Sequence, residues 1–190
     1  MNWVVFIVFA YAALGMEWGL RDALQLGNLP VAPSFVMILL VFISLWATPM
    51  VSIVAGLILG AMLDMLNQLP ARDGTDVVVL GPHALGCMLA AYTVVTMRAL
   101  MFRRGVLSLA FLSVVAMAIA QIIVVSLLYV RSRYDVISIM GSGQELSSRL
   151  ASAVATGVVA FPVGAALGLF KGLFGFDEAA RKPFRIRPRL

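Results

Sequence analysis

The stretch VAPSFVMILLVFISLWATPMVSIVAGLILGAMLDML, residues 31–66, decides the fold. It is almost entirely apolar, and a single helix of that length, rising 1.5 Å per residue, would measure about 54 Å. The hydrocarbon core of a bilayer is only about 30 Å thick, so the stretch must fold back on itself. We expect the corner at Thr48-Pro49, because the residue before a proline avoids the helical region. The stretch therefore predicts two spans, Val31–Ala47 and Pro49–Leu66, joined by a tight, uncharged turn.

The composition of the whole chain agrees with a membrane protein. Of 190 residues, 62% are hydrophobic and only 12% are charged, and the mean hydropathy is +1.02. A soluble domain usually carries about 25% charged residues, which cover its surface. This shortage of charge excludes ordinary soluble, disordered and coiled-coil proteins. The long, continuous apolar runs favour helices over alternating strands.

Four further apolar runs complete a prediction of six spans. They are Asn2–Leu20, Gly81–Arg98, Val106–Val130 and Ser147–Phe174. We therefore expect an all-α membrane protein with six transmembrane helices in one domain, residues 1–175, followed by a basic cytoplasmic tail, residues 176–190. The two longer connections, residues 67–80 and 131–146, are expected to hold the least regular structure.

The net charge of +5 arises from basic residues that flank the spans. If the N-terminus is inside, the inner loops and tail hold nine of the 14 basic residues: Arg98, Arg103, Arg104, Lys171, Arg181, Lys182, Arg185, Arg187 and Arg189. This excess predicts that both termini are cytoplasmic, with contacts to anionic membrane lipid. We expect no nucleic-acid partner, because no aromatic residues alternate with the basic ones and no binding module is present.

The first specific feature is a row of residues in the third span. Gly56, Gly60 and Asp64 lie four residues apart and share one helical face, with the carboxylate near the outer end. Glycines at this spacing let another helix approach closely, and a carboxylate in a membrane must face protein or water. The row predicts either tight packing within the protein, with Asp64 capping a neighbouring helix, or a contact surface that leads to a polar site.

The second feature is the segment Leu80–Gly86, LGPHALG, which opens the fourth span. His83 would begin this span on the side where Asp64 ends the previous one, so a hydrogen bond between them is expected. A zinc site needs at least three ligands, and a chain with one histidine and one cysteine would have to recruit Asp73 and Asp76. No serine or cysteine motif for nucleophilic catalysis accompanies His83. We expect no enzyme, no metal site and no cofactor.

Small residues four apart also run along the whole sixth span. They are Ser148, Ser152, Thr156, Ala160, Gly164, Gly168 and Gly172. Such a ridge suits close contact with another helix, within the protein or in a partner. Gln121, in the fifth span, should form a hydrogen bond to another helix. Both features are more typical of helix association than of a transport path.

Residues 56–64, GLILGAMLD, together with the segment Leu80–Gly86 and Tyr92, resemble the signature region of the MreD family of rod shape-determining membrane proteins of bacteria. The resemblance covers about half of the chain. The matching motif positions are Gly56, Gly60, Asp64, Gly81, Ala84, Leu85 and Tyr92.

The resemblance implies a six-helix protein of the bacterial inner membrane, related in fold to the substrate-binding subunits of energy-coupling-factor transporters. It implies a non-enzymatic role in the complex that elongates the peptidoglycan cell wall. An MreC-like protein would be the close partner, with MreB, RodA and a transpeptidase in the wider complex.

An alternative from a different class is the substrate-binding subunit of an energy-coupling-factor vitamin importer. Such a site needs several polar or aromatic groups that converge near the outer face. Glu17, Trp18, Asp64, His83 and Gln121 are the candidates, and Gln121 is expected to lie too deep.

Overall fold

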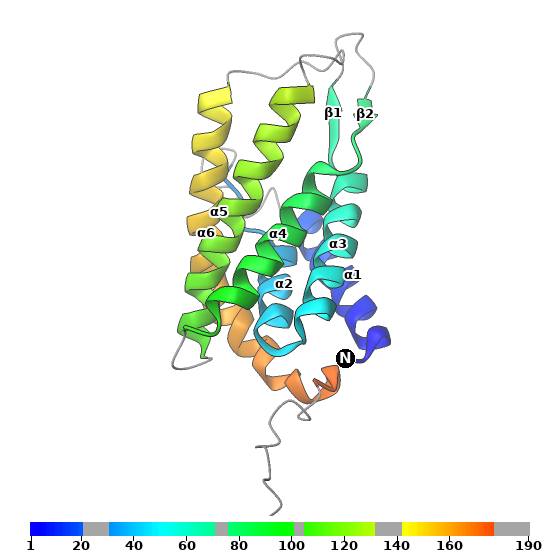
Figure 1. Cartoon of the computed structure of the whole chain (residues 1–190), viewed down its shortest axis with the longest axis vertical. Helices are drawn as coiled ribbons and strands as arrows, with labels where there is room; N and C mark the ends of the chain where they lie inside the picture. The colour runs from blue at the N-terminus through cyan, green and yellow to red at the C-terminus, as the bar shows by residue number, and fades with distance from the viewer. Residues whose placement is uncertain (21–30, 71–75, 101–104, 132–141, 177–190) are drawn as a thin grey trace, which may run out of the picture.

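The computed structural model describes residues 1–20, 31–70, 76–100, 105–131 and 142–176. Within these ranges it holds six α-helices, a short β-hairpin and one 3-10 turn. The elements are α1 (Trp3–Gly19), α2 (Phe35–Trp46), α3 (Pro49–Leu66), β1 (Gln68–Pro70), β2 (Asp76–Val78), α4 (Pro82–Met97), α5 (Val106–Arg131), α6 (Ser142–Leu169) and the 3-10 turn η1 (Lys171–Phe174). The helices form one bundle, and the hairpin extends from the end where α3 stops and α4 begins (Figure 1). The prediction of a helical protein with six helices is confirmed.

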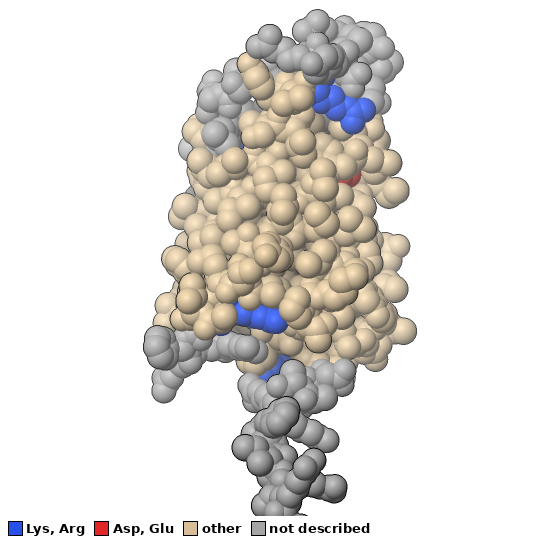
Figure 2. Space-filling model, viewed as in Figure 1, with Lys and Arg blue, Asp and Glu red and all other residues tan. Residues whose placement is uncertain are grey.

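Three of the described helices are long and apolar enough to cross a membrane: α3, α5 and residues 147–169 of α6. The other three, α1, α2 and α4, are apolar but contain 17, 12 and 16 residues. Figure 2 shows a largely uncharged face with Lys and Arg side chains near its two ends. These features support a membrane protein, while a count of six complete spans stays a prediction.

The central helix α2 begins later than the sequence predicted. We expected a span from Val31, but the helix starts at Phe35. Pro33 lacks an N–H and restricts the residue before it, and the Ser34 hydroxyl then caps the helix by accepting a hydrogen bond from Met37 N at 3.2 Å. At about 1.5 Å per residue, the 12 residues of α2 measure about 18 Å, less than the thickness of a bilayer core.

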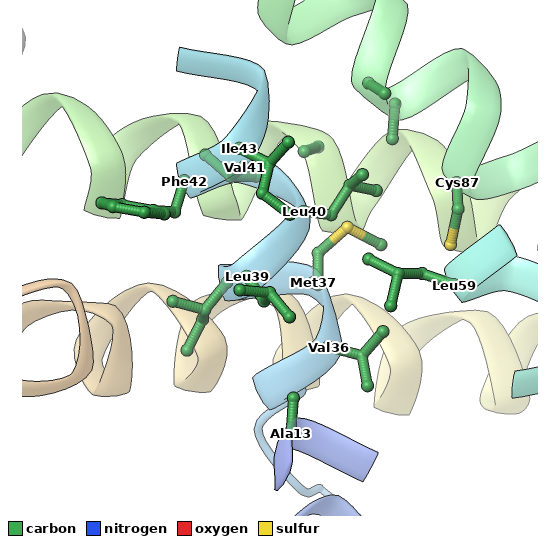
Figure 3. Close-up of a cluster of buried hydrophobic side chains, with 14 of the residues drawn as sticks. Ala13, Val36, Met37, Leu39, Leu40, Val41, Phe42, Ile43, Leu59 and Cys87 are labelled. Atoms are coloured by element: carbon green, nitrogen blue, oxygen red, sulfur yellow. The ribbon is translucent and has the colours of Figure 1, made fainter. Parts of the chain in front are cut away.

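Helix α2 is enclosed by the rest of the bundle. Every residue from Phe35 to Leu45 is buried, and α2 contacts each of the other five helices. Figure 3 shows its side chains directed toward its neighbours, with Leu59 of α3 and Cys87 of α4 close by. Helix α2 is thus apolar around its circumference except at Ser44, and it meets protein on all sides.

The turn at Thr48-Pro49 was predicted correctly. Helix α2 ends at Trp46 and α3 begins at Pro49, so only Ala47 and Thr48 separate them. A proline in the first helical turn costs no hydrogen bond, because that N–H would have no partner within the helix.

Helices α3 and α4 pack closely because α3 carries glycines on the shared face. A Cβ added to Gly56 would lie 2.8 Å from Cys87 O, and one added to Gly60 would lie 2.5 Å from Ala84 Cα. A side chain at either glycine would push the backbone of α4 away. Of the two readings of this row, the structure favours packing within the protein.

The small-residue ridge of α6 divides into a buried part and an exposed part. Thr156 and Ala160 are buried, and a Cβ on Gly164 would lie 3.0 Å from Leu109 Cδ2 of α5. A Cβ on Gly168 or Gly172 would meet nothing within 4 Å. The ridge therefore packs mainly within the protein, and only its last two positions, Gly168 of α6 and Gly172 of η1, are open.

The chain start and η1 lie at the end of the bundle opposite the hairpin (Figure 1). Asn2 N donates a hydrogen bond to Phe174 O at 2.8 Å, and the Phe174 ring lies 4.9 Å from Phe9 and 5.6 Å from Phe42. The two ends of the helical domain thus share one side, while the cytoplasmic orientation stays a prediction. The predicted basic tail falls outside the described residues from position 177 on.

Candidate functional site

Asp64 at the end of α3 caps the N-terminus of α4. Its buried carboxylate accepts hydrogen bonds from Gly81 N at 2.8 Å, His83 N at 2.9 Å and Ala84 N at 3.1 Å. These groups need an acceptor, because the first N–H groups of a helix have no partner within it. The predicted bond to histidine is also present, with His83 Nδ1 at 2.8 Å from Asp64 Oδ1. One carboxylate thus fixes both the start of α4 and the orientation of its imidazole.

The backbone at Gly81 makes this cap possible. Gly81 has a φ angle of +123°, which lies in a region that residues with a Cβ atom rarely adopt. This conformation directs its N–H toward Asp64 immediately before Pro82 begins the helix. The Gly-Pro-His order of the motif is therefore a helix start that is built to receive a carboxylate.

A second carboxylate, Glu17 of α1, caps the N-terminus of α2 in the same way. The sequence suggested Glu17 as a site residue but did not predict this capping role. Glu17 accepts hydrogen bonds from Ser34 Oγ at 2.9 Å and Val36 N at 3.0 Å. Ser34 N donates in turn to Thr156 Oγ1 of α6 at 3.0 Å. The Pro33-Ser34 pair before an apolar run is a signal for a helix start and could have located this contact.

Gln121 of α5 pairs with Arg149 of α6. Arg149 donates a hydrogen bond from Nη1 to Gln121 Oε1 at 2.8 Å. The sequence predicts a position for Gln121 that is too deep for a site, whereas its side chain reaches Arg149 of α6. Because α6 begins at Ser142, Arg149 lies two turns inside the helix, at the level of Gln121.

These polar groups line one cavity of about 910 Å³ at the hairpin end of the bundle. Glu17, Trp18, Asp64, His83 and Gln121, the five candidates from the sequence, all lie in its wall. Arg149, Ser148, Ser152 and Asn67 add further polar groups, and Leu14, Met37, Met117, Val124 and Leu128 supply apolar surface. The cavity thus combines an apolar wall with a few convergent polar groups, as small-molecule sites do.

The described part of the chain contains no group of three His, Cys, Asp or Glu residues that could hold a metal ion. Cys87 lies one turn after His83 on α4, is buried, and also lines the cavity. Asp73 lies outside the described residues, as does the side chain of Asp76.

The remaining motif positions face outward. Leu85 and Tyr92 of α4 are 42% and 54% exposed, and Leu89 between them is also exposed. Residues at this spacing share one helical face. The motif therefore has an inner part, which binds α3 to α4, and two outward positions, Leu85 and Tyr92. Together with Leu89, which is not a motif position, they form a surface that we call the α4 outer face.

No protein-family model, curated protein or solved structure matches this chain. The resemblance to the MreD family therefore stays a prediction from the residues of the motif.

Proposed function

We propose that this protein is a non-enzymatic membrane component of the bacterial cell-wall elongation complex, and that it binds an MreC-like partner in the inner membrane. The two termini would lie in the cytoplasm. MreB, RodA and a transpeptidase would belong to the same larger assembly.

The observation that carries this proposal is the division of the motif between an inner and an outer part. Asp64, Gly60 and Gly81 hold α3 and α4 together as a unit. Leu85 and Tyr92, which belong to the same motif, stand exposed on that unit. A rigid helix pair that presents an apolar face suits a partner helix, because association in membranes depends on close packing.

Depletion of the protein in its host tests the biological role. We expect cells to lose rod shape and lateral wall insertion to fall, as measured by incorporation of a fluorescent D-amino acid. Rod shape and lateral insertion that persist after depletion would contradict the proposal.

A substitution on the α4 outer face tests the partner contact. We expect Tyr92→Ala to reduce co-purification of an MreC-like partner, because the ring is half exposed on the proposed contact. Tyr11→Ala is the matched control, since Tyr11 is also exposed but lies on α1. Equal recovery of the partner with both variants would contradict a contact at this face.

The cavity favours a second candidate, a substrate-binding subunit of an energy-coupling-factor vitamin importer. All five residues that the sequence suggested for such a site line this one cavity. Uptake of radiolabelled vitamins by cells with and without the protein distinguishes the two functions, because a scaffold would leave uptake unchanged.

A further inference from the structure

The cavity at the hairpin end exists because the central helix stops short. Helix α2 has 12 residues, whereas α5 and α6, which both contact it, have 26 and 28 residues. At about 1.5 Å per residue, α2 fills about 18 Å of a bundle whose longest helices measure about 40 Å. Ser34 and Met37, at the start of α2, line the cavity together with residues of the other five helices. The space is thus bounded by all six described helices and lies beyond the N-terminus of α2.

The charged groups of the cavity wall are engaged by the protein itself. Asp64 accepts three backbone N–H groups and contacts His83 Nδ1, which fill the roughly four acceptor positions of a carboxylate. Glu17 caps α2, Arg149 donates to Gln121, and both charged residues take part in further interactions. A charged ligand would lose its hydration without gaining a free counter-charge from these three groups. The wall therefore favours an uncharged ligand.

His83 offers one hydrogen-bond acceptor that the fold leaves open. An ionised carboxylate can only accept, so the proton between Asp64 and His83 belongs to Nδ1. In the neutral imidazole Nε2 is then an acceptor, and it has no hydrogen-bond partner among the residues that the structure describes. His83 lines the cavity, and its side chain is 16% exposed. Asp64 thus fixes the tautomer of the ring and leaves the opposite edge, with Nε2, for a ligand.

Gln121 of α5 offers a donor that complements this acceptor. Its Oε1 accepts a hydrogen bond from Arg149, so Nε2 is the end of the amide that remains. In the described part of the chain, Nε2 contacts only the thioether of Met117, at 3.8 Å. A thioether is a weak acceptor, and the amide therefore retains donor capacity. His83 and Gln121 thus present an acceptor and a donor, and neither group is charged.

The packing of α4 against α5 brings these two groups to one region of the wall. A Cβ added to Gly86 would lie 3.0 Å from Ala120 O, so the two helices approach closely at that point. His83 lies three residues before Gly86, and Gln121 directly follows Ala120. Each is therefore within about one helical turn of the same contact. A single ligand can reach both side chains.

We infer that this cavity binds an uncharged molecule that carries an amide group on an apolar body. The amide C=O would accept a hydrogen bond from Gln121 Nε2, and its N–H would donate to His83 Nε2. The apolar body would lie along Leu14, Val124 and Leu128. A volume of about 910 Å³ is in the range of sites for small organic molecules. The inference concerns this cavity alone, and it rests on neither the scaffold function nor the importer function.

Equilibrium dialysis measures binding of a radiolabelled probe to the full chain in nanodiscs, with empty nanodiscs as the blank for partition into lipid. The probe is N-methyl-6-phenylhexanamide, in mildly alkaline buffer, which favours the neutral imidazole. Three competitors keep the apolar body: methyl 6-phenylhexanoate, which has an oxygen in place of the N–H, anionic 6-phenylhexanoate and cationic 6-phenylhexylammonium. We expect saturable binding of the amide, binding of the ester that is about three- to tenfold weaker, and the weakest binding for the two ions.

Two variants assign the two hydrogen bonds. His83→Asn places an amide nitrogen where the ring has Nδ1, so the bond to Asp64 is kept while the acceptor Nε2 is lost. It should weaken binding of the amide by about three- to tenfold and leave the ester unchanged. Gln121→Glu keeps an oxygen for Arg149 but loses the N–H donor, so it should weaken binding of both compounds.

Ser126→Ala is the matched control, because it removes a polar group of α5 that lies outside the residues lining the cavity. It should change the affinity for the amide by less than about twofold. If a variant does not fold, the comparison of probes on the native chain still decides the question.

Four outcomes would overturn the inference. They are no saturable binding above the empty nanodiscs, equal binding of amide and ester to the native chain, tighter binding of either ion, and a preference for the amide that persists in His83→Asn. Hexylbenzene that binds as tightly as the amide would also overturn it, because the cavity would then accept any apolar chain. These measurements require neither a partner protein nor uptake, so their failure is distinguishable from failure of either proposed function.

Discussion

The two ends of the bundle are closed in different ways. At the hairpin end, Glu17 and Asp64 cap the N-termini of α2 and α4, and a cavity remains between the capping groups. At the opposite end, Arg98 donates hydrogen bonds from Nη1 to Ser44 O at 2.5 Å and Ala47 O at 2.6 Å, at the C-terminus of α2. Each charge thus complements the helix end it contacts.

The side chains that pack at the two ends of the bundle also differ. Phe174 packs with Phe9, Phe42 and Phe176 at the end that Arg98 closes, and Lys171 Nζ lies 3.3 Å from the centre of the Trp46 ring. Aromatic rings fill space there, whereas the hairpin end holds polar groups around a hollow. Aromatic packing thus stabilises one end, whereas capping carboxylates stabilise the other end around a cavity.

Asp64→Ala should produce the largest effect and would break the hairpin end. It leaves three backbone N–H groups and His83 Nδ1 without their acceptor. We expect the free energy of unfolding in bicelles to fall by about 3–5 kcal/mol, because each buried donor left without a partner costs about 1–3 kcal/mol. Asp64→Asn keeps one acceptor oxygen, so its free energy of unfolding should fall by less. Equal losses for the two variants would contradict the capping role.

Arg98→Met tests the opposite end. It removes two hydrogen bonds from a charged donor to the carbonyls that end α2, and we expect a loss of about 2–3 kcal/mol in the free energy of unfolding. Arg98→Lys retains the charge and should therefore lose less stability than Arg98→Met. Equal losses for Arg98→Met and Arg98→Lys would show that the charge at this position does not contribute to the stability of the α2 end.

Gly60→Ala tests the helix contact beneath the cavity. Its new Cβ would clash with His83 O and lie 2.5 Å from Ala84 Cα, so α3 and α4 must separate, at a cost of about 2 kcal/mol. Gly168→Ala is the control, because its Cβ meets nothing within 4 Å. The control should be neutral or slightly stabilising, since alanine forms helices better than glycine. Equal destabilisation by the two variants would show that the glycine contact does not matter.

Glu17→Gln should have the smallest effect. It retains an acceptor for Val36 N and Ser34 Oγ but loses the charge at the start of α2. The interaction of a charge with a helix end is worth about 1 kcal/mol, which is the loss we expect in the free energy of unfolding. A loss as large as that of Asp64→Ala would mean that Glu17 holds more of the fold than its hydrogen bonds account for.

The sequence predicted the parts of the fold that depend on local chemistry. Pro49 and Pro82 marked helix starts that the structure confirms, because a missing N–H is tolerated only in the first turn. The bond between Asp64 and His83 followed from placing two polar groups at the same membrane boundary. Both predictions depend only on residues within one helix or on two helices that follow each other in the sequence.

Contacts between helices distant in sequence were not predictable in the same way. Arg149 and Gln121 are 28 residues apart, and their meeting depends on how α5 packs against α6. Thr156 reaches Ser34 across 122 residues. The residues that unite the cavity wall come from helices whose relative rotation a single sequence does not determine.

The enclosure of α2 has a consequence for how the protein is made. During synthesis α2 and α3 emerge before α4, α5 and α6, and the two residues between them suit insertion as one hairpin. At that stage α2 has only α1 and α3 beside it, so most of its surface must be tolerated by lipid. We expect the largely apolar circumference of α2 to suit this stage, before the later helices pack around it.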